Sequence, residues 1–245
     1  MKNFILGSLV ISAALVSGSQ QVFAGETGDT GRSNVDIEYI VNADTTKPID
    51  PTNPGNEVKP NPENPGTGNV GPLSIDYVSN IQFGKQKAYG GNTSYFASLD
   101  EVINKDDSKK EVPNYVQVTD NRGNNAGWSL SVKQDGFLKN SKQSMMEKAE
   151  LRLLNGISNS SNASILSPTA NQAVALKLDT TGKGINSTLL TADNGKGAGT
   201  WTTSFGKTVN EGKNSVELFV PGGTVIEKGA YSTTLVWTLS ADAAQ

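Results

Sequence analysis

Two tryptophan motifs carry the strongest binding chemistry in this sequence. Trp128 and Trp237 each begin the pattern Trp-(Ser/Thr)-Leu-Ser. An aromatic face can stack on the apolar face of a sugar ring, while neighbouring amides and hydroxyls bond to the hydroxyl groups of the ring. Because side chains alternate across a strand, Trp128 shares a face with Leu130, and Trp237 shares a face with Leu239. Glycan binding is therefore one hypothesis for both motifs.

The same residues also fit a structural role. A tryptophan on an apolar strand face usually belongs to the core, where its side chain buries about 150–250 Å². Val132 and Leu235 extend the apolar faces of the two strands. From the residues alone, Trp128 and Trp237 either contact a ligand or build the sheet that displays the site. Trp201 lacks a leucine two residues later and has no assigned role.

A compact polar cluster, Asp120-Asn121-Arg122-Gly123, precedes the first motif. Arg122 has the geometry to hold a ligand carboxylate through two hydrogen bonds, and Asp120 is a second candidate for polar contacts. Asp and Asn side chains also stabilise tight turns by bonding to nearby backbone amides. The turn is the interpretation that we favour for this cluster.

The composition excludes most catalytic chemistry. The 245 residues include no His and no Cys, which removes the commonest general base, the usual zinc ligands and any disulfide. A glycosidase needs two carboxylates, but the acidic pair Asp106-Asp107 lies in a charged loop and no calcium-loop pattern occurs. The net charge of −3 gives no excess of positive charge with which to bind nucleic acid. The sequence therefore predicts no enzyme activity, no metal site and no cofactor.

The N-terminus predicts export. Lys2 precedes an apolar run from Phe4 to Val16, and Val22-Phe23-Ala24 places compact residues where a signal peptidase cleaves. We expect a signal peptide over residues 1–24, because the run is shorter than the roughly 20 residues that span a bilayer. The mature chain, residues 25–245, shows no Leu-Pro-x-Thr-Gly sorting signal. Secretion without a covalent anchor is the expectation.

The main body, residues 73–245, alternates short β-prone runs with Gly, Asn, Asp and Ser. This spacing predicts a single all-β domain, a β-sandwich or barrel, with little helix. The expected strands are residues 73–78, 115–119, 127–133, 148–154, 173–178, 199–205, 215–220 and 231–240. One or two helical turns are expected within residues 141–149.

Seven of the ten prolines lie between Pro48 and Pro72. Proline has no amide donor, so we expect residues 42–72 to form an extended linker or loop outside the sheets and the core. Before it, residues 34–41 alternate apolar with mainly polar side chains, which predicts a half-buried strand. A lone strand is unstable, so this one should dock on a sheet of the main body. The Pro-rich segment would then be a long loop inside one domain.

The two Trp-x-Leu motifs resemble those of the WxL domain of Gram-positive surface proteins. The closing block, residues 231–239, is similar to the Tyr-x-x-x-Leu-x-Trp-x-Leu ending of that family. Residues 71–78 with 83–84, and residues 118–123, resemble further family segments. The chain departs from the family in its tail, which lacks the usual Ala-Pro. The resemblance makes six residues candidates for wall binding: Trp128, Leu130, Tyr231, Leu235, Trp237 and Leu239.

The resemblance implies a β-rich module that attaches non-covalently to peptidoglycan at the cell surface. Peptidoglycan is the expected partner, with no nucleic acid and no membrane span in the mature chain. Members of the family are often made alongside other WxL proteins and a membrane-tethered partner. The alternative is therefore a structural subunit of a multi-protein surface complex, which is retained through a membrane- or wall-anchored partner and contributes to adhesion.

Overall fold

The computed structural model describes residues 32–162 and 165–241. The expected signal peptide, residues 1–24, lies outside the described residues. The chain divides into two units, residues 1–39 and residues 40–245. All the described strands belong to the second unit, together with one short helix, Val209–Gly212 (α1).

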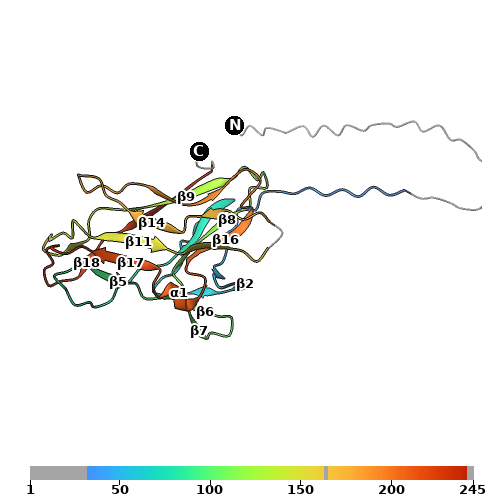
Figure 1. The fold of residues 1–245 in the computed structure, drawn as a ribbon. Coiled ribbons are helices and arrows are strands. Elements are labelled where there is room, and N and C mark those ends of the chain that lie inside the picture. The colour runs from blue at the N-terminus through green and yellow to red at the C-terminus, as the bar shows by residue number, and fades with distance from the viewer. Residues whose placement is uncertain (1–31, 163–164, 242–245) are drawn as a thin grey trace, which may run out of the picture. The chain divides into compact units, whose positions relative to one another are not determined.

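Three four-stranded antiparallel sheets form most of the second unit (Figure 1). The first has the order β14-β11-β17-β5, formed by Ala173–Leu176, Glu150–Leu154, Val216–Val220 and Thr93–Phe96. The second has the order β12-β16-β8-β4, formed by Gly156–Asn159, Gly199–Phe205, Tyr115–Asp120 and Leu73–Val78. The third has the order β13-β15-β9-β19, formed by Thr169–Ala170, Ser187–Ala192, Trp128–Gln134 and Leu235–Ser240.

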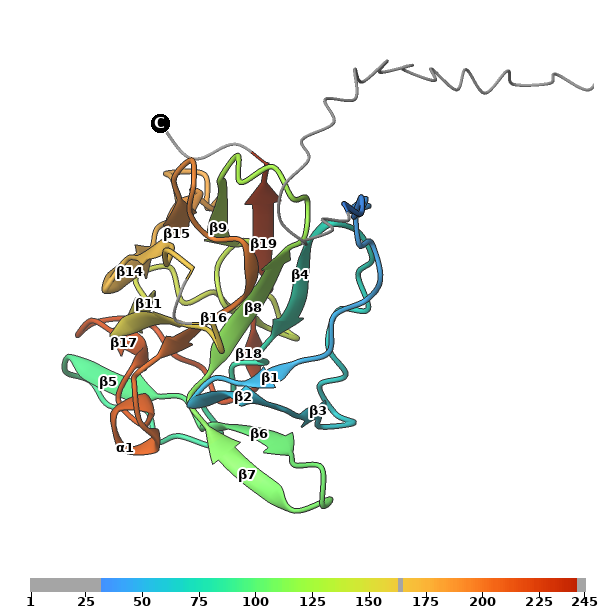
Figure 2. The same ribbon diagram turned by 90° about the vertical axis from the view of Figure 1, so that its right-hand side faces the viewer.

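Three small sheets complete the unit. Two of them are β1-β2, formed by Ile49–Asp50 and Asn53–Glu57, and β10-β18, formed by Lys139–Asn140 and Tyr231–Ser232. The third is β3-β6-β7, formed by Lys59–Pro60, Asp100–Ile103 and Lys109–Val112. Figure 2 shows β1, β2, β3, β6 and β7 gathered at one end of the unit. The predicted all-β class with little helix is confirmed.

Each strand expected in the main body overlaps a strand of the structure. The last one is interrupted at Thr233–Thr234, which separates β18 from β19. The helical turns expected within residues 141–149 do not form; turns and an isolated bridge between Lys139 and Met145 occupy this region. Helix propensity favours a helix here, but a run as short as Met145 to Ala149 is too short for a stable helix without support from packing.

The main core lies between the three large sheets. Strand β9 shows why: its residues alternate between buried and half-buried positions, so that one face of the strand is fully covered. Trp128, Leu130 and Val132 on this face have no exposed surface. They share one hydrophobic cluster with Leu151 and Leu153 of β11. The strand periodicity in the sequence therefore identifies the core face correctly.

The Pro-rich segment does not stay outside the sheets and the core, contrary to the prediction. Strands β1, β2 and β3 all lie within residues 42–72, and Val58 is 4% exposed. Val58 belongs to a second hydrophobic cluster, in which Tyr77 and Tyr115 stack with ring centroids 4.6 Å apart. Pro54 lies in an edge strand and Pro60 ends one, and these are positions at which a sheet tolerates a missing amide.

The predicted N-terminal strand is also absent. Residues 34–41 form no strand, and Val35, Ile37 and Tyr39 are 90%, 75% and 86% exposed instead of half-buried. A period of two identifies a segment that is able to form a strand, but a strand also needs a partner with free backbone groups. Among the described residues, none pairs with this segment.

Candidate functional site

Trp128 lies inside the main core. It begins β9, and its indole Nε1 donates a hydrogen bond to the carbonyl oxygen of Gly197 at 3.0 Å. Gly197 has a φ of 75°, and a Cβ there would lie 2.7 Å from Nε1 of Trp128. The glycine thus allows the backbone to approach the indole closely. Because the side chain has no exposed surface, Trp128 reaches no ligand in this arrangement and supports the sheet instead.

Trp237 lies on the edge strand of the same sheet. It pairs with Val132 of β9, and Leu239 pairs with Leu130. The side chains of Leu235, Trp237 and Leu239 pack against the main core but stay half-buried, whereas Val236 on the other face is 36% exposed. The difference from Trp128 follows from position, since among the described strands β9 has a neighbour on both sides and β19 has a neighbour on one side.

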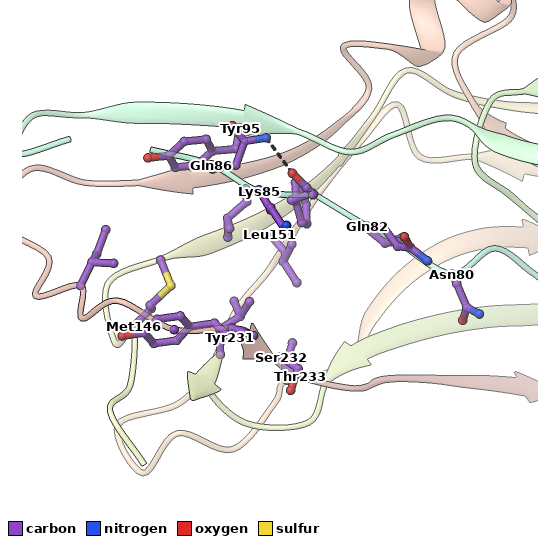
Figure 3. A pocket seen from close by; sticks show the side chains of 18 of the residues that line it. Asn80, Gln82, Lys85, Gln86, Tyr95, Met146, Leu151, Tyr231, Ser232 and Thr233 are labelled. Carbon is purple, nitrogen blue, oxygen red and sulfur yellow. Dashed lines mark hydrogen bonds between the residues drawn. The ribbon is translucent and has the colours of Figure 1, made fainter. Parts of the chain in front are cut away.

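A cleft of about 1260 Å³ opens beside Trp237. Residues 78–88 and residues 226–235 line it together with Trp237, and five buried side chains complete its lining: Tyr95, Leu138, Met146, Leu151 and Leu218. We call this the Trp237 cleft. Figure 3 shows Tyr95 and Tyr231 on opposite sides of the cleft with Leu151 between them. Three of the six motif residues, Tyr231, Leu235 and Trp237, therefore meet at one surface.

Tyr231 fixes one side of the cleft. Tyr231 pairs with Asn140 in the β10-β18 ladder, and its side-chain hydroxyl accepts a hydrogen bond from the amide of Glu227 at 2.9 Å. The hydroxyl also lies 3.2 Å from Oγ of Ser144. These contacts hold residues 227–231 as a closed turn. The ring of Tyr231 is thus held at the cleft from both neighbouring segments.

Asp120 and Arg122 form a clamp away from the cleft. Nε and Nη2 of Arg122 donate to the two carboxylate oxygens of Asp120, at 2.9 and 2.8 Å. Nη2 also donates to the carbonyl oxygen of Gly127 at 2.6 Å, and Nη1 to that of Ala241 at 3.1 Å. The amide of Arg122 donates to Asp120 as well, at 3.1 Å. The bond from the amide of Arg122 to Asp120 is of the kind that the turn interpretation expects. The bonds from the guanidinium group to Gly127 and Ala241, which join this turn to the start of β9 and the end of β19, were not predicted.

Sequence reasoning missed much of the cleft lining. Ile81 and Phe83 lie in the 78–88 segment and pack against the main core, although no strand contains them. Met146 comes from the stretch that was expected to be helical and is 5% exposed. A family-like sequence around Phe83 was visible, but neither its periodicity nor its charge pointed to a site.

Two further observations concern the chemistry available to the protein. In the described ranges no helix has the length and apolar character needed to cross a membrane. Within the same ranges no cluster of three or more acidic, His or Cys residues has the geometry to hold a metal ion.

Comparison with known proteins gives the family. A search of the curated proteins and a search of the solved structures found no match. A family model described as the WxL domain, surface cell wall-binding, matches residues 26–242. The match spans both Trp-x-Leu motifs and nearly the whole chain, and it assigns the protein to the cell surface and wall. The chain therefore belongs to the family of WxL surface cell wall-binding domains.

Proposed function

We propose that this protein is secreted through its N-terminal leader and attaches non-covalently to the Gram-positive cell wall by binding peptidoglycan in the Trp237 cleft. One observation carries the proposal: Tyr231, Leu235 and Trp237 of the family ending line a single apolar cleft, whereas Trp128 is enclosed by the core. Ligand sites are typically concave and mostly apolar, with a few polar groups that fix orientation. The cleft has that composition.

The chemistry of the lining suits a peptidoglycan fragment. The half-exposed indole of Trp237 and the ring of Tyr231 offer faces on which sugar rings stack. Side-chain amides of Asn80, Gln82 and Gln86 line the same cleft and are able to bond sugar hydroxyls and peptide groups. Lysines on the lining segments supply cations for the carboxylates of stem peptides.

The lining also favours a binding role over hydrolysis. Glycoside hydrolysis uses two carboxylates about 5–10 Å apart, and of the described residues that line the cleft, Glu227 alone is acidic. The sequence contains no His to act as a general base. A non-enzymatic attachment module fits these two facts.

Co-sedimentation of the purified mature protein with purified Gram-positive peptidoglycan tests the proposal. We expect the protein to pellet with the wall material, and we expect soluble muropeptides to release it. Protein that stays in the supernatant would contradict direct binding. It would favour the alternative, a subunit that a membrane- or wall-anchored partner holds at the surface.

A further inference from the structure

The segment 35–41 exposes an unusual amount of apolar surface. Its five large apolar side chains are 56–90% exposed: Val35, Ile37, Tyr39, Ile40 and Val41. Contiguous exposed apolar residues in a water-soluble protein mark an interaction site. In an extended conformation, Val35, Ile37, Tyr39 and Val41 would share one face, as they would in a strand at a sheet edge. We call residues 35–41 the donor segment.

Strand β19 has an open edge. It ends the β13-β15-β9-β19 sheet, and among the described residues no strand pairs with its outer side. The amide of Asp135 donates to the carbonyl of Thr234 at 2.7 Å, in register with the β9–β19 ladder. Hydrogen-bonded and non-bonded pairs alternate in an antiparallel ladder. The amides and carbonyls of Leu235, Trp237 and Leu239 therefore face away from β9, toward the open edge.

The corresponding edge of the second sheet is covered. Strand β4 ends that sheet, but the amide of Thr67 donates to the carbonyl of Asp76 at 3.1 Å. Nδ2 of Asn69 donates to the carbonyl of Ile75 at 2.9 Å. Residues 67–69 thus occupy the outer side of β4. Among the described residues, the outward amides and carbonyls of β19 have no backbone partner, which makes β19 the better acceptor of an added strand.

The surface beside the β19 edge complements the donor segment in polarity and charge. The Trp237 cleft offers half-buried apolar side chains from Ile81 and Phe83, against which an added strand would pack its apolar face. Lys85, Lys87 and Lys228 line the cleft with Glu227, a net charge of +2 at these four positions. The donor segment carries Asp36 and Glu38, a net charge of −2. In an extended donor, Asp36 and Glu38 lie on the face opposite the apolar one, so this charge difference steers the approach of the two copies and places no ion pair in the cleft.

We propose that the donor segment of one copy adds as a strand to the open edge of β19 in a second copy. The seven residues of the donor segment match the six residues of β19 in length. Strand addition satisfies the outward backbone groups of the two partners and buries the exposed apolar face of the donor. Each copy carries one donor segment and one acceptor edge, so the contact is heterologous and joins copies head to tail. The Trp237 cleft then lies at the contact between copies.

A complementation experiment tests this assembly in solution, with no wall material present. Ile37→Asp with Tyr39→Asp disables the donor segment, and Leu235→Pro removes an outward-facing amide from the acceptor edge. Proline is tolerated at the first residue of a strand, and Leu235→Ala is the matched control that shortens the side chain but keeps the amide. Val70→Asp, at a site 71% exposed outside the donor segment, controls for the added charge.

Sedimentation velocity over a range of concentrations measures the outcome. We expect the unaltered protein to form head-to-tail oligomers as concentration rises, and each disabled variant to remain monomeric. An equimolar mixture of the two disabled variants retains one intact donor and one intact acceptor, so it should form a dimer and nothing larger. The Val70→Asp protein should assemble as the unaltered protein does. The Leu235→Ala protein keeps the outward amide but loses part of the cleft lining, so it should still assemble where the Leu235→Pro protein does not.

Three results would overturn the proposal: an unaltered protein that is monomeric at all concentrations, a mixture that fails to dimerise, or donor-disabled protein that still assembles. The proposed wall attachment is tested separately. The donor-disabled variant keeps the Trp237 cleft and should still pellet with peptidoglycan. An unaltered protein that assembles but does not pellet would contradict wall attachment alone, and one that pellets but stays monomeric would contradict the assembly alone.

Discussion

Leu130 and Leu239, the leucines of the two Trp-x-Leu motifs, lie directly opposite each other on neighbouring antiparallel strands. Because the strands run in opposite directions, Trp128 and Trp237 lie on either side of this leucine pair, each two residues away from it along its own strand. The motifs are thus one unit of the sheet, with a buried end and a half-exposed end. The buried tryptophan organises the core, and the half-exposed tryptophan reaches the cleft.

Gly197→Ala should destabilise the protein because the new Cβ would lie 2.5 Å from Cβ of Ala192 and 2.7 Å from Nε1 of Trp128. The matched control is Gly195→Ala, which has a similar φ of 85° but no atom within 4 Å of the new Cβ. Gly195→Ala should lower the free energy of unfolding by about 1–2 kcal/mol because of backbone strain alone. Gly197→Ala should cost about 1–3 kcal/mol more because of overpacking. Denaturant unfolding measures both, and equal costs would contradict the close packing of Trp128.

How far the sequence predicts this architecture depends on the segment. Alternation of apolar and polar residues predicted β9 and β19 correctly, because each of these strands has one face that is more buried than the other. The register of a strand follows from the same pattern. The same rule failed for residues 34–41, where the pattern is present but the described residues provide no pairing partner. Periodicity reports what a segment is able to form, and pairing over long sequence distances decides whether it forms.

The prediction for the Pro-rich segment, residues 42–72, was wrong for a different reason. Composition shows that each proline lacks the amide that donates to a β-ladder. The loss of stability depends on whether that side of the strand has a neighbouring strand, which composition does not show. Side-chain bonds also fix this region: Oε1 of Gln117 accepts from the amide of Ile49 at 2.8 Å, and Nε2 of Gln117 donates to the carbonyl of Lys47 at 3.1 Å. Such contacts join residues about 70 positions apart. The Trp237 cleft was not predicted for the same reason, since the segments that line it are far apart in the sequence.

Arg122→Lys should destabilise the protein although it keeps the positive charge. An ammonium group cannot reproduce the two parallel bonds to Asp120 together with those to Gly127 and Ala241. Asp120 is 4% exposed, so losing its partner should lower the free energy of unfolding by about 1.5–3 kcal/mol. Removing the cation of an exposed pair by Lys196→Ala should cost less than about 1 kcal/mol.

Urea unfolding of these two variants measures the difference. If Arg122→Lys were as stable as the unaltered protein and lost wall retention, Arg122 would serve a ligand and not the fold. If both variants cost the same, the buried clamp would have no special role in holding β19.

Lys110→Met should change how stability depends on pH. Burial raises the pKa of Asp50, but the hydrogen bonds from Lys110 and Thr52 and the charge of Lys110 outweigh it and hold the pKa below its ordinary value of 3.8. Nζ of Lys110 lies 2.5 Å from Oδ2 of Asp50. A lowered pKa contributes stability above pH 3.8 that is lost as the pH falls through the folded value. Without Lys110, the effect of burial on the pKa of Asp50 is opposed by fewer interactions, among them the two hydrogen bonds from Thr52, so this contribution shrinks.

The unaltered protein should therefore exceed Lys110→Met in unfolding free energy at pH 6, and the gap should narrow as the pH falls below 3.8 and through the lowered pKa of Asp50 in the folded protein. Thermal or chemical unfolding at several pH values gives the two curves. Lys109→Met is the control, because Lys109 is an adjacent exposed lysine that pairs with Glu101 and makes no contact with Asp50. A gap that is constant with pH would contradict the coupling of Asp50 to Lys110.

Trp237→Ala and Trp128→Ala should separate binding from folding. Trp128 is fully buried, so its removal should lower the free energy of unfolding by about 3–5 kcal/mol. Trp237 is half-buried on an edge strand, so Trp237→Ala should lower the free energy of unfolding by less than Trp128→Ala does. We expect Trp237→Ala to remain folded but to lose retention on peptidoglycan, because the stacking surface of the cleft is gone. Val236→Ala, one residue earlier on the opposite face of β19, should keep both properties.

Circular dichroism establishes folding, and co-sedimentation with peptidoglycan establishes retention. A folded Trp237→Ala protein that still pellets would remove the Trp237 cleft from the proposed function. Loss of retention in Val236→Ala as well would move the site to the solvent face of the sheet. Loss in Trp128→Ala carries meaning only where the variant stays folded, since Leu130 and Leu239 join the two tryptophans in one sheet and damage to the core also displaces Trp237.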